Sequence, residues 1–194
     1  MFPLIPAGGA DCFGVFKEET MGFGSTRLAP PISVALFRAG FGILYLHAAW
    51  QKAPWVINDG QRFGWLYGWI WQEINHPTFG WYKAFLQSVV LPNFTFFGYM
   101  SFFTEVALGL SFLFGLFTVL GGIGGALWQV NIALGSYSVP TEWGWIWFLL
   151  IAPPLVFAQS RAGRTLGIDQ VLYSRLGEGE VQRTGITKLL LRLI

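Results

Sequence analysis

Four long apolar stretches constrain the fold of this chain more than any other feature of its sequence. Each has about 18 to 25 mostly apolar residues, enough at about 1.5 Å per helical residue to cross roughly 30 Å of hydrocarbon. They cover residues 31–50, 94–118, 120–139 and 143–160. Of the 194 residues, 54% are hydrophobic and 11% are charged, which leaves too little charge for the surface of a soluble domain. The sequence therefore predicts an all-α integral membrane protein built as a four-helix bundle.

The residues on either side of the spans are interpreted as two arms. Residues 1–30 contain glycine, proline and scattered aromatic residues without a helical period, and residues 161–194 form a polar, basic tail. Eight basic residues lie on the side of both termini and three on the opposite side, and basic segments stay in the cytoplasm. We therefore expect a membrane domain over residues 31–160, in a bacterial or archaeal inner membrane, with cytoplasmic N- and C-terminal arms.

The stretch between the first two spans, residues 50–93, is rich in aromatic residues. It holds six of the ten tryptophans, and tryptophan collects where an apolar ring lies at the level of the lipid headgroups. We expect short interfacial helices on the outer face, with residues 81–90 the best helical candidate. Two interpretations remain open: an aromatic belt that anchors the protein, and a wall of rings around a ligand or quinone site.

Glu105 is the most unusual residue within the spans. It lies eleven residues from Phe94, about 17 Å below the outer surface, where a carboxylate must be protonated, paired or in contact with water or a ligand. Arg38 is one candidate partner, and His47 and Lys52 are alternatives that would approach from the outer side. Such groups either hold helices together by hydrogen bonds or form a site that exchanges protons with a quinone.

On the functional interpretation, the polar residues of the spans divide into two groups. Glu105, Arg38 and His47 are the candidate catalytic residues. Candidate substrate-binding residues are Lys52, Tyr45, Trp128 and Asn131.

No metal or haem site is expected, because the two histidines lie 29 residues apart and Cys12 is the single cysteine. A quinone is the expected redox ligand. The expected partners are the lipid bilayer and other membrane subunits, held through the N-terminal arm and the aromatic surface, and not a nucleic acid.

Three stretches, which together cover about residues 36–172, resemble the DoxX/DoxD family. The run FRAGFGILYLHAAWQKAPW is similar to the first span of that family. The segment HPTFGWYKAFLQSVVLPNFTFFGYMSFFTEVALGLSFLFGLFT resembles its DoxD-like branch, and AGRTLGIDQVL resembles its C-terminal signature.

The resemblance implies a four-helix membrane protein that serves as the membrane subunit of a thiosulfate:quinone oxidoreductase. It places the family's charged positions on Arg38, Lys52, Glu105, Arg164 and Asp169. A second function stays open, that of a non-catalytic accessory subunit of a larger respiratory or photosynthetic membrane complex, because the sequence carries no redox cofactor motif.

Overall fold

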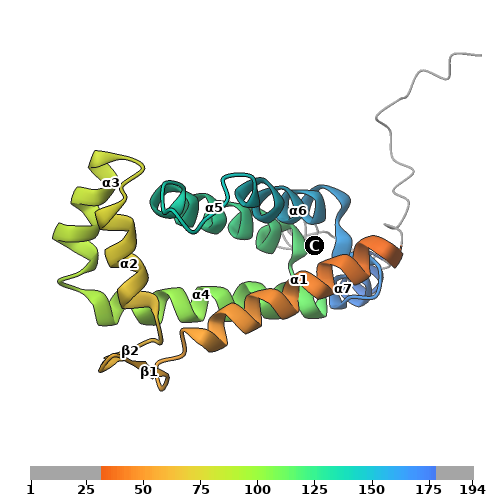
Figure 1. Ribbon diagram of the computed structural model, residues 1–194. Helices are drawn as coiled ribbons and strands as arrows, with labels where there is room; N and C mark the ends of the chain where they lie inside the picture. The colour runs from red at the N-terminus through yellow and green to blue at the C-terminus, as the bar shows by residue number, and fades with distance from the viewer. Residues whose placement is uncertain (1–31, 178–194) are drawn as a thin grey trace, which may run out of the picture.

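The computed structural model describes residues 32–177, and nearly all of its regular structure is helical (Figure 1). Three helices are long and apolar enough to cross a membrane: α1 (Ile32–Gln51), α4 (Phe94–Phe114) and α5 (Thr118–Ser136). The fourth, α6 (Ile146–Ser160), has 15 residues, about 22 Å of helix. The described residues therefore hold three helices of spanning length and one shorter apolar helix, so the predicted count of four full spans is not confirmed.

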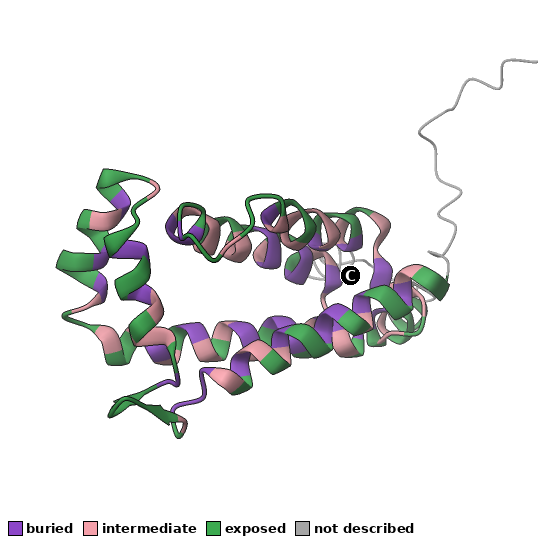
Figure 2. Cartoon of the chain, viewed as in Figure 1, coloured by how far each residue is buried: buried purple, intermediate pink, exposed green. Residues whose placement is uncertain are grey.

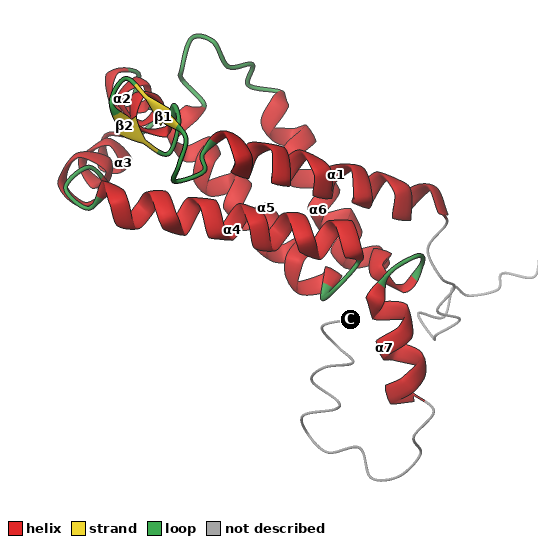
Figure 3. Ribbon diagram, turned by 90° about the horizontal axis from the view of Figure 1, so that it is seen from below, coloured by secondary structure: helices red, strands yellow, loops and turns green. Residues whose placement is uncertain are grey.

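The four apolar helices form two pairs, α1 with α4 and α5 with α6 (Figures 1 and 3). Small residues let the backbones approach within each pair. A Cβ atom on Gly42 would lie 2.5 Å from the Leu113 backbone nitrogen of α4, and one on Gly122 would lie 2.4 Å from the Pro154 carbonyl oxygen of α6. Close backbone approach through small residues is typical of membrane helices.

Large apolar side chains cover the outside of these helices. Phe37 of α1, Phe103 of α4, Leu127 of α5 and Phe148 of α6 each expose more than half of their surface. Buried residues follow the inward faces of the same helices (Figure 2). Since lipid solvates such side chains, this pattern matches a protein whose outer surface faces hydrocarbon.

The turn between α4 and α5 lies several residues earlier than the sequence indicated. The expected spans, 94–118 and 120–139, meet at residue 119, but the chain turns at residues 115–117. Gly115 (φ +63°) and Phe117 (φ +50°) both adopt left-handed conformations there, and a left-handed glycine is a common way to end a helix. Gly121 and Gly122 are thereby left inside α5, where they contact Ser111 and α6.

Residues 52–93 fold over one end of the bundle, which we call the loop end (Figure 1, left). A short hairpin of β1 (Ile57–Asn58) and β2 (Gln61–Arg62) comes first, with Asp59 and Gly60 both at positive φ. It is followed by α2 (Leu66–Asn75), α3 (Gly80–Phe85) and the π-helix η1 (Leu86–Val90). The predicted helix at residues 81–90 is confirmed as α3 with η1, whereas α2 and the hairpin were not predicted from the sequence.

The opposite end, which we call the tail end, is closed by η2 (Ala162–Arg164) and α7 (Ile168–Gly177) (Figure 3). These elements pack against α1, α6 and the α4–α5 turn. The first part of the expected basic tail, residues 161–177, is therefore a folded part of the bundle and not a separate arm. The expected N-terminal arm, residues 1–30, and the end of the tail, residues 178–194, lie outside the described residues.

Candidate functional site

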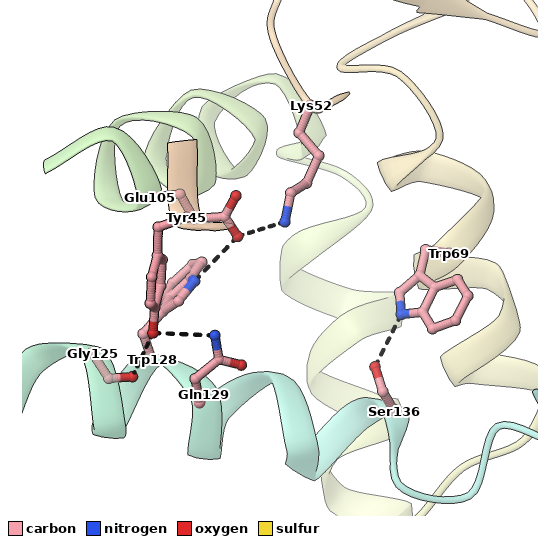
Figure 4. A network of polar contacts seen from close by, with 8 residues as sticks. All are labelled: Tyr45, Lys52, Trp69, Glu105, Gly125, Trp128, Gln129 and Ser136. Carbon is pink, nitrogen blue, oxygen red and sulfur yellow. Dashed lines mark hydrogen bonds and ion pairs between the residues drawn. The ribbon is translucent and has the colours of Figure 1, made fainter. Parts of the chain in front are cut away.

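Glu105, in the middle of α4, forms a buried ion pair with Lys52. Lys52 directly follows the last residue of α1, and its Nζ lies 2.5 Å from Glu105 Oε1 (Figure 4). Trp128 of α5 donates from Nε1 to the same oxygen at 3.3 Å. The other oxygen, Oε2, is buried and has no hydrogen-bond partner among the described residues. An unpartnered carboxylate oxygen in a buried site is costly and indicates contact with water or a ligand.

A second set of polar contacts lies next to this pair. The Tyr45 hydroxyl donates to the Gly125 carbonyl oxygen at 3.3 Å and accepts from Gln129 Nε2 at 3.1 Å (Figure 4). A Cβ atom on Gly125 would lie 3.3 Å from that hydroxyl, so the glycine gives the tyrosine its place against α5. These bonds hold Tyr45 on the wall of a cavity that Glu105 also lines.

Two cavities meet at Lys52. Cavity A, about 190 Å³, lies between the loop-end helices and the α4 and α5 helices. Aromatic and aliphatic side chains form most of its wall, and its polar groups come from Lys52, Glu73, Tyr82, Ser101 and Asn131. Apolar walls with a few convergent polar groups are typical of small-molecule sites. Since an apolar cavity of about 150 Å³ can hold a benzene ring, the volume of cavity A suits a single ring.

Cavity B, about 240 Å³, lies on the side of Lys52 where α1, α4, α5 and α6 meet. Glu105, Tyr45, Gln129 and Trp147 line it. Trp147 Nε1 is buried and, like Glu105 Oε2, has no partner among residues 32–177. Two residues that line the same cavity therefore carry a free donor and a free acceptor, which suits a small hydrogen-bonding molecule such as water.

Glu73 of α2 is a buried carboxyl that was not among the site residues predicted from the sequence. Ser136 of α5 donates to Glu73 Oε1 at 2.5 Å, and Trp69 Nε1 donates to that serine oxygen at 2.9 Å. Burial raises the pKa of Glu73 from 4.5 to about 7, while the hydrogen bonds and the charge of Lys52 lower it by less. The available signal was one acidic residue within the aromatic run WLYGWIWQEIN, which we interpreted only as an interfacial segment.

Some of the predicted site residues lie together around the two cavities, and others lie elsewhere. Lys52, Trp128 and Asn131 line cavity A, and Glu105, Tyr45 and Lys52 line cavity B. His47 is exposed on α1, with its Nε2 atom 3.0 Å from Gln51 Nε2. His47 and Lys52 were the two expected alternatives to Arg38 as a partner of Glu105, and Lys52 is the one that forms the ion pair.

Arg38 lies at the tail end and forms no bond with Glu105. Its guanidinium donates to the Ala162 carbonyl oxygen at 2.9 Å and to the Leu166 carbonyl oxygen at 3.0 Å. Asp169 is buried nearby and accepts from the backbone nitrogens of Phe117 and Thr118 at 2.7 and 2.9 Å. Arg38 therefore joins α1 to the segment that follows α6, and Asp169 joins α7 to the α4–α5 turn.

The family model described as TQO small subunit DoxD matches residues 34–194. The chain belongs to the DoxD family. Comparison with curated proteins and with solved structures finds no match. With three helices of spanning length, membership identifies an integral membrane protein. Among residues 32–177 there is no group of three or more histidine, cysteine, aspartate or glutamate side chains that would hold a metal ion.

Proposed function

We propose that this chain is the membrane subunit of a quinone-linked oxidoreductase, that thiosulfate is the electron source, and that cavity A binds the quinone ring. Family membership supports the class of enzyme. The observation that carries the site is the Lys52–Glu105 pair, a buried cation on the wall of an apolar, aromatic cavity. A buried ionisable pair within a membrane bundle is costly and usually functional.

In this proposal Lys52 is the group that recognises the quinone. Its ammonium group donates a hydrogen bond to one quinone oxygen and stabilises the negative charge that the oxygen gains when electrons arrive. Glu105 holds Lys52 at the cavity wall through the ion pair. Asn131 of α5 and the Tyr82 hydroxyl of α3 supply polar groups elsewhere in the cavity. The electrons come from thiosulfate by way of a partner subunit.

The site's position in the membrane follows from the charge distribution. Arg161, Arg164 and Arg175 belong to the tail end, whereas the loop end carries Lys52, Arg62 and Lys83. With the basic termini included, the tail end faces the cytoplasm in this proposal. Cavity A then lies near the outer face of the inner membrane.

Quinone reduction by isolated membranes tests the proposal. Membranes that contain the wild-type chain and its partners should reduce a short-chain quinone when thiosulfate is added. Glu105→Gln and Lys52→Met should lower this rate about 100-fold, because each removes one half of the ion pair. Arg175→Met removes an exposed cation far from the site and should leave the rate unchanged. Wild-type rates in both pair variants would contradict the assignment of the site.

The accessory-subunit alternative is favoured by one surface. Trp50, Trp55 and Trp81 at the loop end each expose more than half of their area, and aromatic surfaces of this kind are frequent in subunit contacts. If the chain is only an accessory subunit, deleting it should disrupt assembly, while Glu105→Gln and Lys52→Met should assemble and reduce quinone normally.

A further inference from the structure

Glu73 has a built environment at the edge of cavity A. Its side chain is 7% exposed and lines the cavity together with Lys52. Ser136 bonds to one carboxyl oxygen, and Trp69 bonds to Ser136, so the carboxyl is held from two elements, α5 and its own helix α2 (Figure 4 shows the Trp69–Ser136 contact). The proposed function assigns this carboxyl no role, although a buried acid beside a ligand cavity is costly to keep.

Gly135 gives the carboxyl its place. A Cβ atom on Gly135 would lie 2.5 Å from both Glu73 Cδ and Glu73 Oε2. Real atoms do not approach so closely, and the obstacle would be the carboxyl group itself. The acid therefore occupies this position against α5 only because residue 135 has no side chain.

Three hollows meet at Trp65 and Trp69 beside this acid. Both rings line cavity A and cavity B, and both also line an open groove of about 550 Å³ at the loop end. Gln72 and His76 of the α2 region and Thr141 supply polar groups to the groove. Glu73 lies on the same helix as Trp69 and Gln72, and it lines cavity A but not the groove, so α2 lies between the two hollows.

We propose that Glu73 is a proton-transfer residue that carries protons from the groove to a quinone in cavity A. The inference rests on the proposed function. Reduction of a quinone to a quinol takes two electrons, which the sulfur donor supplies, and two protons. The protonated Glu73 carboxyl gives one proton to a quinone oxygen and becomes a carboxylate. Water in the groove then reprotonates it, and the cycle repeats for the second proton.

The charge environment of Glu73 is compatible with this role. The titratable groups around it are Lys52 after α1, Tyr82 of α3, Glu105 of α4 beyond Lys52, Glu142 beyond Ser136, and His76 at the end of its own helix. Burial raises its pKa to about 7, so both protonation states are populated at neutral pH, as an efficient proton carrier requires.

Infrared spectroscopy of the purified complex tests the titration directly. The carbonyl band of a protonated carboxylic acid should disappear between pH 5 and pH 9 with a midpoint near 7 in the wild type, and this titrating band should be absent in Glu73→Gln. A Glu73 carboxyl that keeps one protonation state from pH 5 to pH 9 would overturn the proposal.

Turnover against pH gives the second measurement. Wild-type quinone reduction should decline as the pH rises above about 7, because the protonated fraction of Glu73 falls. In Glu73→Gln the rate should fall about 10- to 100-fold and lose this pH dependence, while quinone affinity stays within about twofold. Glu73→Asp should restore part of the rate. An unchanged pH profile in Glu73→Gln would overturn the role of Glu73.

Substitution of Gly135 gives a variant that keeps Glu73 but displaces its carboxyl group. Gly135→Ala should push the carboxyl out of its place, lower its midpoint toward 4.5 and slow turnover, whereas Gly124→Ala on the same helix meets only Leu108 at 3.8 Å and should do neither. An unchanged midpoint in Gly135→Ala would count against the inference.

The two proposals fail in different ways. Absence of thiosulfate-dependent quinone reduction in the wild type removes the proposed function and, with it, the delivery of protons to quinone. Normal wild-type turnover with an unaltered Glu73→Gln profile removes only the inference about Glu73.

Discussion

The two ends of the bundle each bury a cation and a carboxylate, but they satisfy these charges differently. At the tail end, Asp169 accepts three hydrogen bonds, from two backbone nitrogens and the Thr118 hydroxyl. Arg38 donates to two backbone carbonyl oxygens, and its Nε has no partner among the described residues. In the pair that Lys52 of the loop end forms with Glu105 of α4, both contacts of Glu105 fall on one oxygen, and the other oxygen has no partner among the described residues. Lys52 and Glu105 also line cavities, whereas Arg38 and Asp169 line neither cavity A nor cavity B.

The difference separates structural charges from functional ones. A carboxylate that backbone donors saturate fixes the position of loops and has no capacity left for a ligand. A pair that leaves an oxygen free beside a cavity costs stability and keeps that capacity. Both kinds occur among the charged positions that the DoxX/DoxD resemblance singled out, so a shared charge in this family does not by itself identify a site.

The largest effect should follow from changing the fully bonded tail-end carboxylate, Asp169. Asp169→Asn replaces one of the two accepting oxygens by an NH₂ group that faces backbone donors, so the free energy of unfolding should fall by about 3 kcal/mol. Unfolding in mixed micelles by titration with sodium dodecyl sulfate measures it. Asp59→Asn, at an exposed turn, should change the value by less than about 0.5 kcal/mol. Equal effects of the two variants would show that the tail-end carboxylate is not structural.

At the loop end, burial of the Glu73 carboxyl should lower the free energy of unfolding as the pH rises. Between pH 4.5 and 7 the folded chain keeps the proton of Glu73 that the unfolded chain has already released. Stability should therefore fall with rising pH across this window, by up to about 3 kcal/mol, and stay lower above it. The difference in thermal unfolding between the wild type and Glu73→Gln, followed from pH 4 to pH 8, isolates this contribution. A difference that does not vary with pH would contradict the burial of an ionisable acid at this position.

The smallest of these losses in stability is expected from alanine substitutions at two glycines with positive φ. Gly60 has no atom within 4 Å of a built Cβ, so Gly60→Ala should cost about 1 kcal/mol from backbone strain alone. A Cβ on Gly115 would lie 2.1 Å from Arg38 Nη1 and 2.8 Å from Gly167 Cα, so Gly115→Ala should cost about 2 kcal/mol. The same unfolding titration measures both. A smaller loss for Gly115→Ala than for Gly60→Ala would mean that Arg38 is not held in place at the tail end.

The long helices and the position of Glu105 could be predicted because both depend on local sequence. Apolar length fixes a spanning helix, and a lone glutamate in such a run must find a partner. Lys52 was among the partners expected because it follows the first span on the outer side. The contacts of Arg38 were not predictable, since they are backbone carbonyl oxygens 124 and 128 residues further along the chain. Such long-range contacts cannot be predicted from composition or local sequence.

Glu73 was missed for a different physical reason. The tryptophans around it are typical of an interfacial belt, and that interpretation hid a short helix whose inner face bears an acid. Only the fold brings Ser136 and the bare backbone of Gly135 to that acid, from more than sixty residues away. The sequence did contain the Asp59-Gly60 pair, a strong hairpin signal, which would have divided the loop and exposed α2 as a separate element.

Quinone affinity of the folded protein tests most directly whether the two ends differ in function. The dissociation constant for a short-chain quinone is measured by titration of the wild type, Lys52→Met and Asp169→Asn under conditions where each is folded. We expect Lys52→Met to weaken binding about tenfold or more, because the cation that contacts the quinone oxygen is lost, and Asp169→Asn to bind like the wild type despite its lower stability. Unchanged affinity in Lys52→Met, or lost affinity in folded Asp169→Asn, would contradict the division between a structural end and a functional end.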